Sequence, residues 1–186
     1  MKKIFFPFVA LCALLFCVPQ QAKAQEAKLK NAVYGELGGP GVLFSFNYDS
    51  RIIKGERLGL GYRIGAGFSV ATFKELEELY TDINNREYRN ITRSYYTIPV
   101  GMNYVLGREG SVHAFEMGAG ATLLTRKASL FYYEKSNPGH FIGHFTFMYR
   151  RVPINGGFSL RVGFTPIIGT SGDLYPMAAF GIGHSF

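Results

Sequence analysis

The sequence predicts an all-β protein, an eight-stranded antiparallel barrel that crosses a membrane. Three observations support this prediction. Apolar residues recur at every second position, most such segments are long enough to cross a bilayer, and short and long connections alternate. A period of two is typical of a strand whose two faces meet different surroundings. A tilted strand needs about nine to eleven residues to cross the hydrocarbon core.

The clearest segment covers residues 58–70. Its even positions, from Leu58 to Val70, are apolar, and its odd positions are glycine except for Arg63 and Ser69. Such a face is unusual for a surface exposed to bulk water. We expect the apolar face to meet lipid, and the glycine face to line a narrow lumen where small residues leave room for longer neighbours.

The same alternation recurs along the chain, with a weaker first segment in which Tyr34 and Glu36 lie on the polar face. The predicted strands cover residues 31–38, 44–49, 58–70, 96–106, 115–123, 141–150, 158–168 and 178–186. Aromatic residues fall near the strand ends, as in the aromatic girdles of membrane barrels.

The connections alternate in length, which predicts the orientation of the barrel. Short turns, expected on the periplasmic side, fall at residues 53–55, 107–110 and 153–156. Outer loops are expected at residues 71–93, 125–139 and 170–175. A tight turn at residues 38–41 is the exception on the outer side. Short periplasmic turns and longer extracellular loops are typical of outer-membrane barrels.

Two segments within the long loops have patterns of their own. Residues 74–80 are expected to form one or two helical turns, because Leu76, Leu79 and Tyr80 would share a face. The apolar segment 130–133 is expected either to extend a strand above the membrane or to expose a strand edge.

The first 24 residues are predicted to be a signal peptide that is removed on export. Lys2 and Lys3 precede an apolar run at residues 5–18, and residues 22–24 have the small-x-small pattern of a cleavage site. The barrel domain is therefore expected to cover residues 25–186. Both cysteines of the chain lie in the leader, so no disulfide is expected in the mature protein.

Composition excludes one class of function and leaves two fold classes. The formal charge of +7 falls to +4 when Lys2, Lys3 and Lys23 are removed, and no basic run remains to predict nucleic-acid binding. The chain is 47% hydrophobic without a long apolar run in its mature part. An exported chain of this kind is either a soluble sandwich or a membrane barrel, and the glycine-rich polar face favours the barrel.

The lumen is expected to hold a neutral set of charged side chains. Its predicted members are three acids and three arginines: Glu36, Asp49, Glu116, Arg63, Arg150 and Arg161. Four of them, Glu36, Arg63, Glu116 and Arg161, lie at similar heights and are expected to form one layer of ion pairs. Arg63 is expected to pair with Glu36 or Glu116. Such a layer could seal the lumen, because buried charges must be paired, or it could form a gated path for small solutes.

The histidines offer no catalytic or metal site, and no cofactor is predicted. His184 and Ser185 are neighbours, so a strand points them to opposite faces. His140 and His144 share a face but would lie roughly 13 Å apart. His113 lies near a predicted periplasmic turn, with no serine and acid beside it.

The chain resembles the small eight-stranded outer-membrane barrels of the OmpA/OmpX type, and more closely the small barrels of Bacteroidetes-type bacteria. The similar stretches are residues 34–39, 45–48, 98–104 and 163–166, with the terminal Phe186. The resemblance implies a bacterial outer membrane, contact with its lipids and lipopolysaccharide, and a C-terminal aromatic recognised by the barrel-assembly machinery.

The resemblance implies a location and no reaction. We expect a non-enzymatic barrel with a structural or surface-interaction role, carried by loops 71–93 and 125–139, which could contact a surface ligand or partner protein. The alternative is a narrow solute or ion channel. The third possibility is an enzyme that modifies lipid A.

Overall fold

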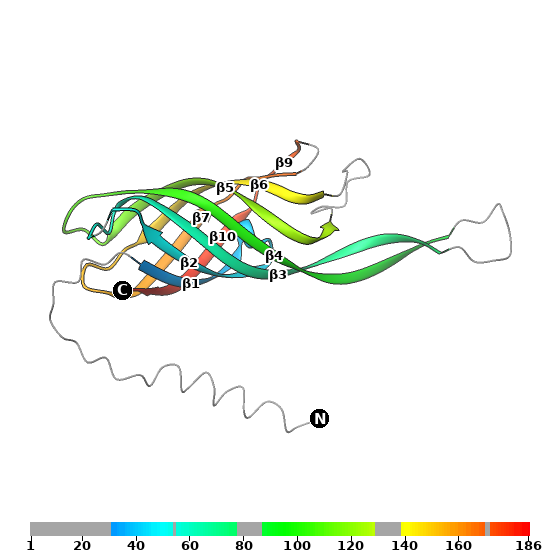
Figure 1. Cartoon of the computed structure of the whole chain (residues 1–186), viewed down its shortest axis with the longest axis horizontal. Coiled ribbons are helices and arrows are strands. Elements are labelled where there is room, and N and C mark those ends of the chain that lie inside the picture. Colours follow the sequence, from blue (N-terminus) through cyan, green and yellow to red (C-terminus); the bar gives the residue numbers. More distant parts are fainter. Residues whose placement is uncertain (1–30, 54, 78–86, 129–138, 170–171) are drawn as a thin grey trace, which may run out of the picture.

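The computed structural model describes residues 31–53, 55–77, 87–128, 139–169 and 172–186 (Figure 1). The predicted signal peptide at residues 1–24 lies outside the described residues. No helix in these ranges is long and apolar enough to span a membrane.

Ten strands and one short helix make up the described fold. The strands are β1 (Asn31–Gly38), β2 (Phe44–Arg51), β3 (Gly59–Glu77), β4 (Glu87–Gly107), β5 (His113–Ala128), β6 (Gly139–Arg151), β7 (Gly157–Phe164), β8 (Ile167–Ile168), β9 (Leu174–Tyr175) and β10 (Ala178–Ser185). The helix, a 3-10 turn named η1, covers Gly39–Gly41.

Eight of these strands close into one antiparallel barrel. The hydrogen-bonded order is β5–β4–β3–β2–β1–β10–β7–β6, and a further pairing of β5 with β6 closes the ring. At the seam between the first and last strands, the backbones of Asn31 and Phe186 exchange two hydrogen bonds of 3.0 and 2.9 Å. The predicted eight-stranded barrel is therefore confirmed among the described residues.

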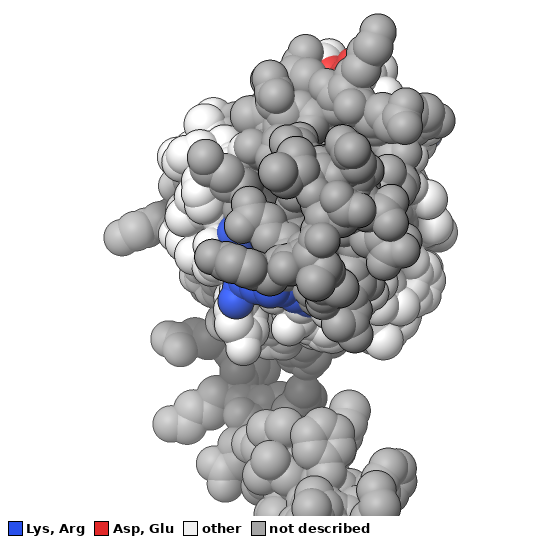
Figure 2. All heavy atoms as spheres, turned by 90° about the vertical axis from the view of Figure 1, so that its right-hand side faces the viewer, with Lys and Arg blue, Asp and Glu red and all other residues white. Residues whose placement is uncertain are grey.

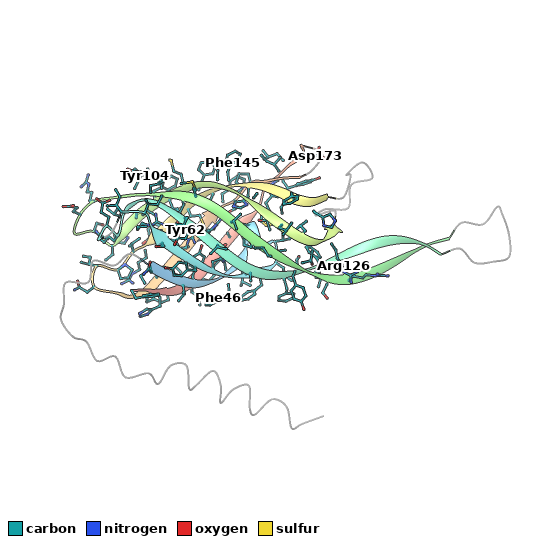
Figure 3. All side chains as sticks on the ribbon, viewed as in Figure 1. Phe46, Tyr62, Tyr104, Arg126, Phe145 and Asp173 are labelled. Carbon is teal, nitrogen blue, oxygen red and sulfur yellow. The ribbon has the colours of Figure 1, made fainter. Side chains whose placement is uncertain are left out.

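The barrel is apolar outside and polar inside. On its outer wall Phe46, Ile64 and Met102 are 57%, 49% and 52% exposed, whereas Asn47 and Thr146 on the inner face are almost fully buried. Figure 3 shows side chains such as Phe46 projecting outward from the wall. A water-soluble protein has the opposite arrangement. The outer wall is built for hydrocarbon, so the chain is a β-barrel of the bacterial outer membrane.

The two ends of the barrel differ. At one end the strands join through short connections, and β1 and β10 bring their outer ends, Asn31 and Phe186, together (Figure 1). At the other end β3 and β4 continue far beyond the barrel and stay paired as far as Glu77 and Glu87. We take the short-turn end as periplasmic and the hairpin end as extracellular.

This hairpin corrects the prediction of helical turns at residues 74–80. Residues 74–77 continue β3 and pair with residues 87–90 of β4, while residues 78–80 lie outside the described residues. A ladder of backbone hydrogen bonds to a partner strand outweighs a weak local helical pattern. In the second long loop, β5 continues to Ala128 and β6 begins at Gly139, so the segment 130–133 also lies outside the described residues.

Two apolar residues leave the predicted alternation. Leu58 does not face lipid, because Gly59 has a positive φ of 85° and the strand begins only there. Leu58 instead packs against an apolar cluster at the periplasmic end. Ile168 does not continue the seventh strand, because β7 ends at Phe164 and Ile168 belongs to β8, which pairs with β6.

Candidate functional site

The lumen contains a chain of alternating charges that crosses the barrel from β2 to β6. Asp49 accepts hydrogen bonds from Arg51 Nη2 at 2.6 Å and from Arg150 Nη2 at 2.9 Å. Arg150 Nη1 donates to Glu116 Oε2 at 3.0 Å. Because β2 and β6 lie on opposite sides of the ring, these bonds tie opposite walls together.

The chain ends at Arg161 on β7. Its Nη2 donates to Glu116 Oε1, and its guanidinium carbon lies 4.2 Å from the centre of the Tyr34 ring on β1. A cation over an aromatic face is attractive, more so away from water. At the other end Asn103 on β4 accepts from Arg51 and donates to Asp49, both at 2.5 Å. The network therefore contacts strands all around the barrel.

A second group lies nearer the extracellular end and reaches η1. Arg63 Nη1 is 3.6 Å from Glu36 Oε2, and Arg63 Nη2 is 3.2 Å from His144 Nε2. Arginine only donates, so His144 must accept at Nε2 and is neutral with its proton on Nδ1. His144 Nδ1 is 3.4 Å from the Thr122 hydroxyl, which donates to the carbonyl of Pro40 at 2.8 Å.

The predicted tight turn at residues 38–41 is in fact a plug in the extracellular mouth. Gly39, Pro40 and Gly41 of η1 are all buried, and the carbonyl of Gly41 accepts a hydrogen bond from Thr97 at 3.1 Å. Val42 follows with a positive φ of 73°, which is strained for a β-branched residue. Tertiary contacts therefore hold η1 inside the barrel wall.

An apolar cluster lies at each end of the polar lumen. At the extracellular end four buried residues pack together with Val42 and Met177 of the mouth: Tyr95, Leu124, Ile142 and Ile167. At the periplasmic end the cluster consists of Val105, Ala114 and Val152, covered by Leu58. The charged network therefore lies between two layers of apolar side chains.

All six charged residues expected in the lumen are buried there, but their arrangement differs from the prediction. Arg63 lies against Glu36, while Glu116 pairs with Arg161 and Arg150, so two separate groups replace one layer. Arg51 was missed, although it is two residues from Asp49 on the same strand face and is only 2% exposed. The described lumen thus holds three carboxylates and four guanidiniums, and the prediction of a neutral lumen is wrong.

The inward glycines make room for these arginines. A Cβ atom at Gly61 would collide with the guanidinium of Arg51 and with the backbone carbonyl of Ser50. At Gly61 the absence of a side chain therefore reflects the size of its neighbours, whereas Gly59 at the start of β3 has a positive φ.

The histidines are dispersed. His113 is exposed, with Nδ1 2.7 Å from the Tyr149 hydroxyl, and His140 has Nδ1 3.0 Å from the Leu124 carbonyl. His144 is buried against Arg63, and His184 lies opposite Val33 at the seam. Within the described ranges no group of three His, Cys, Asp or Glu side chains could hold a metal ion.

The plug offers a test of whether the lumen can open. Replacing Thr97 and Thr122 by valine removes both hydroxyl bonds to η1. The Gly41 carbonyl keeps its bond from the Leu43 N–H, whereas the buried Pro40 carbonyl loses the donor that Thr122 supplies, at about 1–3 kcal/mol. We expect a lower free energy of unfolding in detergent micelles. Planar-bilayer recordings should still show no conductance, because the periplasmic cluster and the charged network remain. Stable conductance in this variant would support a channel.

Comparisons with known proteins give two similar structures. No protein-family model matches the sequence, and no curated protein matches it. The backbone structure of the Yersinia pestis outer membrane protein Ail in a phospholipid bilayer nanodisc has a TM-score of 0.46 and 11% identity, and covers 85% of this chain and 98% of that one. The crystal structure of Ail with the heparin analogue sucrose octasulfate has a TM-score of 0.40 and 11% identity, covering 85% and 95%. Likeness at this level carries no information on individual residues or ligands.

Proposed function

We propose that this protein is a non-enzymatic surface-interaction barrel whose working part is the projecting β3–β4 hairpin, with the neighbouring segment 125–139. The single observation that carries the proposal is the length of the hairpin. β2 stops pairing with β3 at Phe68, and the ladder between β4 and β5 stops at Thr97. Beyond these points the described ladder joins β3 only to β4.

A two-stranded hairpin outside the membrane has two outer edges. The N–H and C=O groups along such an edge can pair with an extended segment of another protein, a recurring mode of recognition. Figure 2 looks onto this end, where atoms of described basic side chains lie on one side and an acidic group lies on the other. The partner we propose is therefore an extended protein segment at the cell surface.

The closed lumen supports this assignment over the channel. Apolar clusters occupy both ends, and charged side chains bridge the walls between them. The scattered histidines do not support the enzyme that modifies lipid A, because such chemistry needs a nucleophile, a base and an acid within hydrogen-bond reach.

The proposal also covers how the protein is exported and inserted into the outer membrane. Residues 1–24 would direct export and be removed. Phe186, which is half exposed and pairs through its backbone with Asn31, would be recognised by the barrel-assembly machinery. Lipids, including lipopolysaccharide, would cover the apolar wall.

The proposed role of the β3–β4 hairpin is tested by shortening the hairpin. Residues 72–92 would be replaced by Asn-Gly, which joins the paired residues Ala71 and Arg93 through a two-residue turn. We expect the barrel to fold, seen as a heat-dependent shift in gel mobility, because the membrane-spanning ladder is intact. A photoreactive amino acid at exposed Tyr96 should give discrete covalent adducts on living cells in the full-length protein and none in the shortened one.

A single substitution can block the edge of β4 alone. Tyr96 N–H donates to the Thr125 hydroxyl on the β5 side, so the N–H of Ser94, two residues along, points the same way. Ser94→Pro would remove that edge donor without removing a bond to β3. The adducts from Tyr96 should disappear in Ser94→Pro and persist in Ser94→Ala. Equal adducts in both variants would contradict pairing at this edge.

A further inference from the structure

The charged side chains of the lumen do not balance. The described interior holds the carboxylates of Glu36, Asp49 and Glu116 and the guanidiniums of four arginines, all at most 4% exposed. His144 is neutral, because it accepts a hydrogen bond from Arg63. Three negative and four positive groups leave a net charge of +1. An uncompensated charge away from water is strongly destabilising, so a counter-charge is required.

Several buried polar atoms of the lumen make no hydrogen bond. Among the described residues they include the donors Tyr34 OH, Arg63 Nη1, and Arg161 Nε and Nη1, and also both carboxylate oxygens of Glu36, one of which lies 3.6 Å from Arg63 Nη1. The Arg161 guanidinium lies over the Tyr34 ring, with its carbon 4.2 Å from the ring centre. These donors come from β1, β3 and β7, and all of them face the lumen.

The wall next to Tyr34 and Arg161 is less tightly packed at Gly181. A methyl group built there would make contacts of 3.4 Å with the Gly35 carbonyl oxygen, 3.5 Å with Tyr34 Cδ2 and 3.6 Å with Arg161 Cβ. Most inward glycines differ: at Gly183, on the same strand, a Cβ would lie 2.5 Å from Tyr34 Cβ. The wall beside Tyr34 and Arg161 therefore has room for a methyl group at Gly181.

We propose that the lumen binds one small monovalent anion of the chloride class between Tyr34, Arg63 and Arg161. The ion would accept hydrogen bonds from the unpartnered donors and neutralise the excess charge. Glu36 lies close by, 3.6 Å from Arg63, and its repulsion favours a single charge over a sulfate or a phosphate. Since an apolar cluster lies at each end, the ion would enter as the barrel folds and would leave only when it opens.

The first test compares folding in different anions at constant ionic strength. The full mature barrel would be refolded into detergent micelles in chloride, bromide or gluconate, and Tm followed by the heat-dependent gel shift. Chloride and bromide should raise Tm by about 3–5 °C for each tenfold increase in concentration, and gluconate should not. An equal response to all three anions would overturn the proposal.

Variants of lumen residues make the test specific, because the rise of Tm with halide concentration should depend on the net charge of the lumen side chains. Arg63→Gln makes the lumen neutral and should abolish the halide response, whereas Glu36→Gln raises its charge to +2 and should increase it. Gly181→Ala fills the space without changing charge and should also abolish the response. Arg108→Gln, an exposed arginine in the β4–β5 turn, is the charge-matched control and should leave it unchanged.

If the charge variants fail to fold, Gly181→Ala and the native chain still decide the question. Crystals of the native barrel grown in bromide should give an anomalous peak within hydrogen-bond distance of Tyr34 OH and Arg161. A peak found on the surface alone would mean an adventitious ion only. Ordered water without bromide among these donors would equally overturn the proposal.

Discussion

Replacing Glu116 by alanine is expected to destabilise the barrel strongly. Glu116 is fully buried and binds both Arg150 and Arg161. Removing its carboxylate leaves Arg150 paired with Asp49 and takes from Arg161 the carboxylate to which it donates. Breaking a buried ion pair by removing one partner costs about 3–5 kcal/mol. The urea-unfolding midpoint in micelles should fall accordingly.

The same variant separates a sealing role from a gating role. If the network seals the lumen, Glu116→Ala should lose stability while its bilayer conductance stays negligible. If the network gates a path, conductance should rise. Glu109→Ala is the matched control, because Glu109 is an exposed acid in the β4–β5 turn. Its loss should change the midpoint by less than about 1 kcal/mol.

Replacing Gly183 by alanine is expected to prevent the barrel from closing. Gly183 on β10 lies opposite Tyr34 on β1, at the seam where the first and last strands meet. An added Cβ would lie 2.5 Å from Tyr34 Cβ and 2.6 Å from Tyr34 Cα. Backbone atoms cannot move aside as a flexible side chain can, so the loss should exceed the roughly 1–3 kcal/mol typical of overpacking. No heat-modifiable folded form should appear.

Gly35→Ala provides the control for this seam. Gly35 is on β1 in the same ladder, but a Cβ there would meet only the Phe44 ring at an ordinary 3.6 Å. The same chemical change should therefore leave folding intact. If Gly183→Ala folds as well as Gly35→Ala, close packing of Tyr34 against the last strand is not what holds the seam.

The strand pattern could be predicted from sequence because each strand separates two environments. From Leu60 to Val70 the apolar and small residues alternate without interruption, and the structure exposes one set to lipid and turns the other inward. The first strand was predicted at residues 31–38 and is found there. Local alternation is sufficient for this purpose, because it depends only on which face each residue occupies.

The helical turns predicted at residues 74–80 show where local pattern fails. A spacing of three and four residues is a weak signal in a short segment, and it carries no information on a partner strand. Backbone pairing of Lys74 with Asn90 and of Glu77 with Glu87 decides the conformation instead. The length of the hairpin, on which the proposed function depends, is thus a property of the pair and not of either segment.

In the lumen, too, some features were predictable from the sequence and others were not. Its charged members were predictable one by one, and Arg51 could have been found from its spacing to Asp49. Their pairing was not predictable, because the shear of a barrel shifts strand heights and long arginine side chains reach across the lumen. Arg150 contacts Asp49 from the opposite wall, 101 residues away in sequence.

The sequence by itself determined the compartment, the strands and which residues face inward, since alternation and polarity act residue by residue. Only the tertiary structure decided that residues 39–41 fold into the mouth as a plug, that Arg63 pairs with Glu36, and that the described part of the lumen holds one more arginine than carboxylates. Each of these depends on which atoms meet inside a closed ring. Closure brings together residues from strands far apart in the chain, and no local pattern encodes those distances.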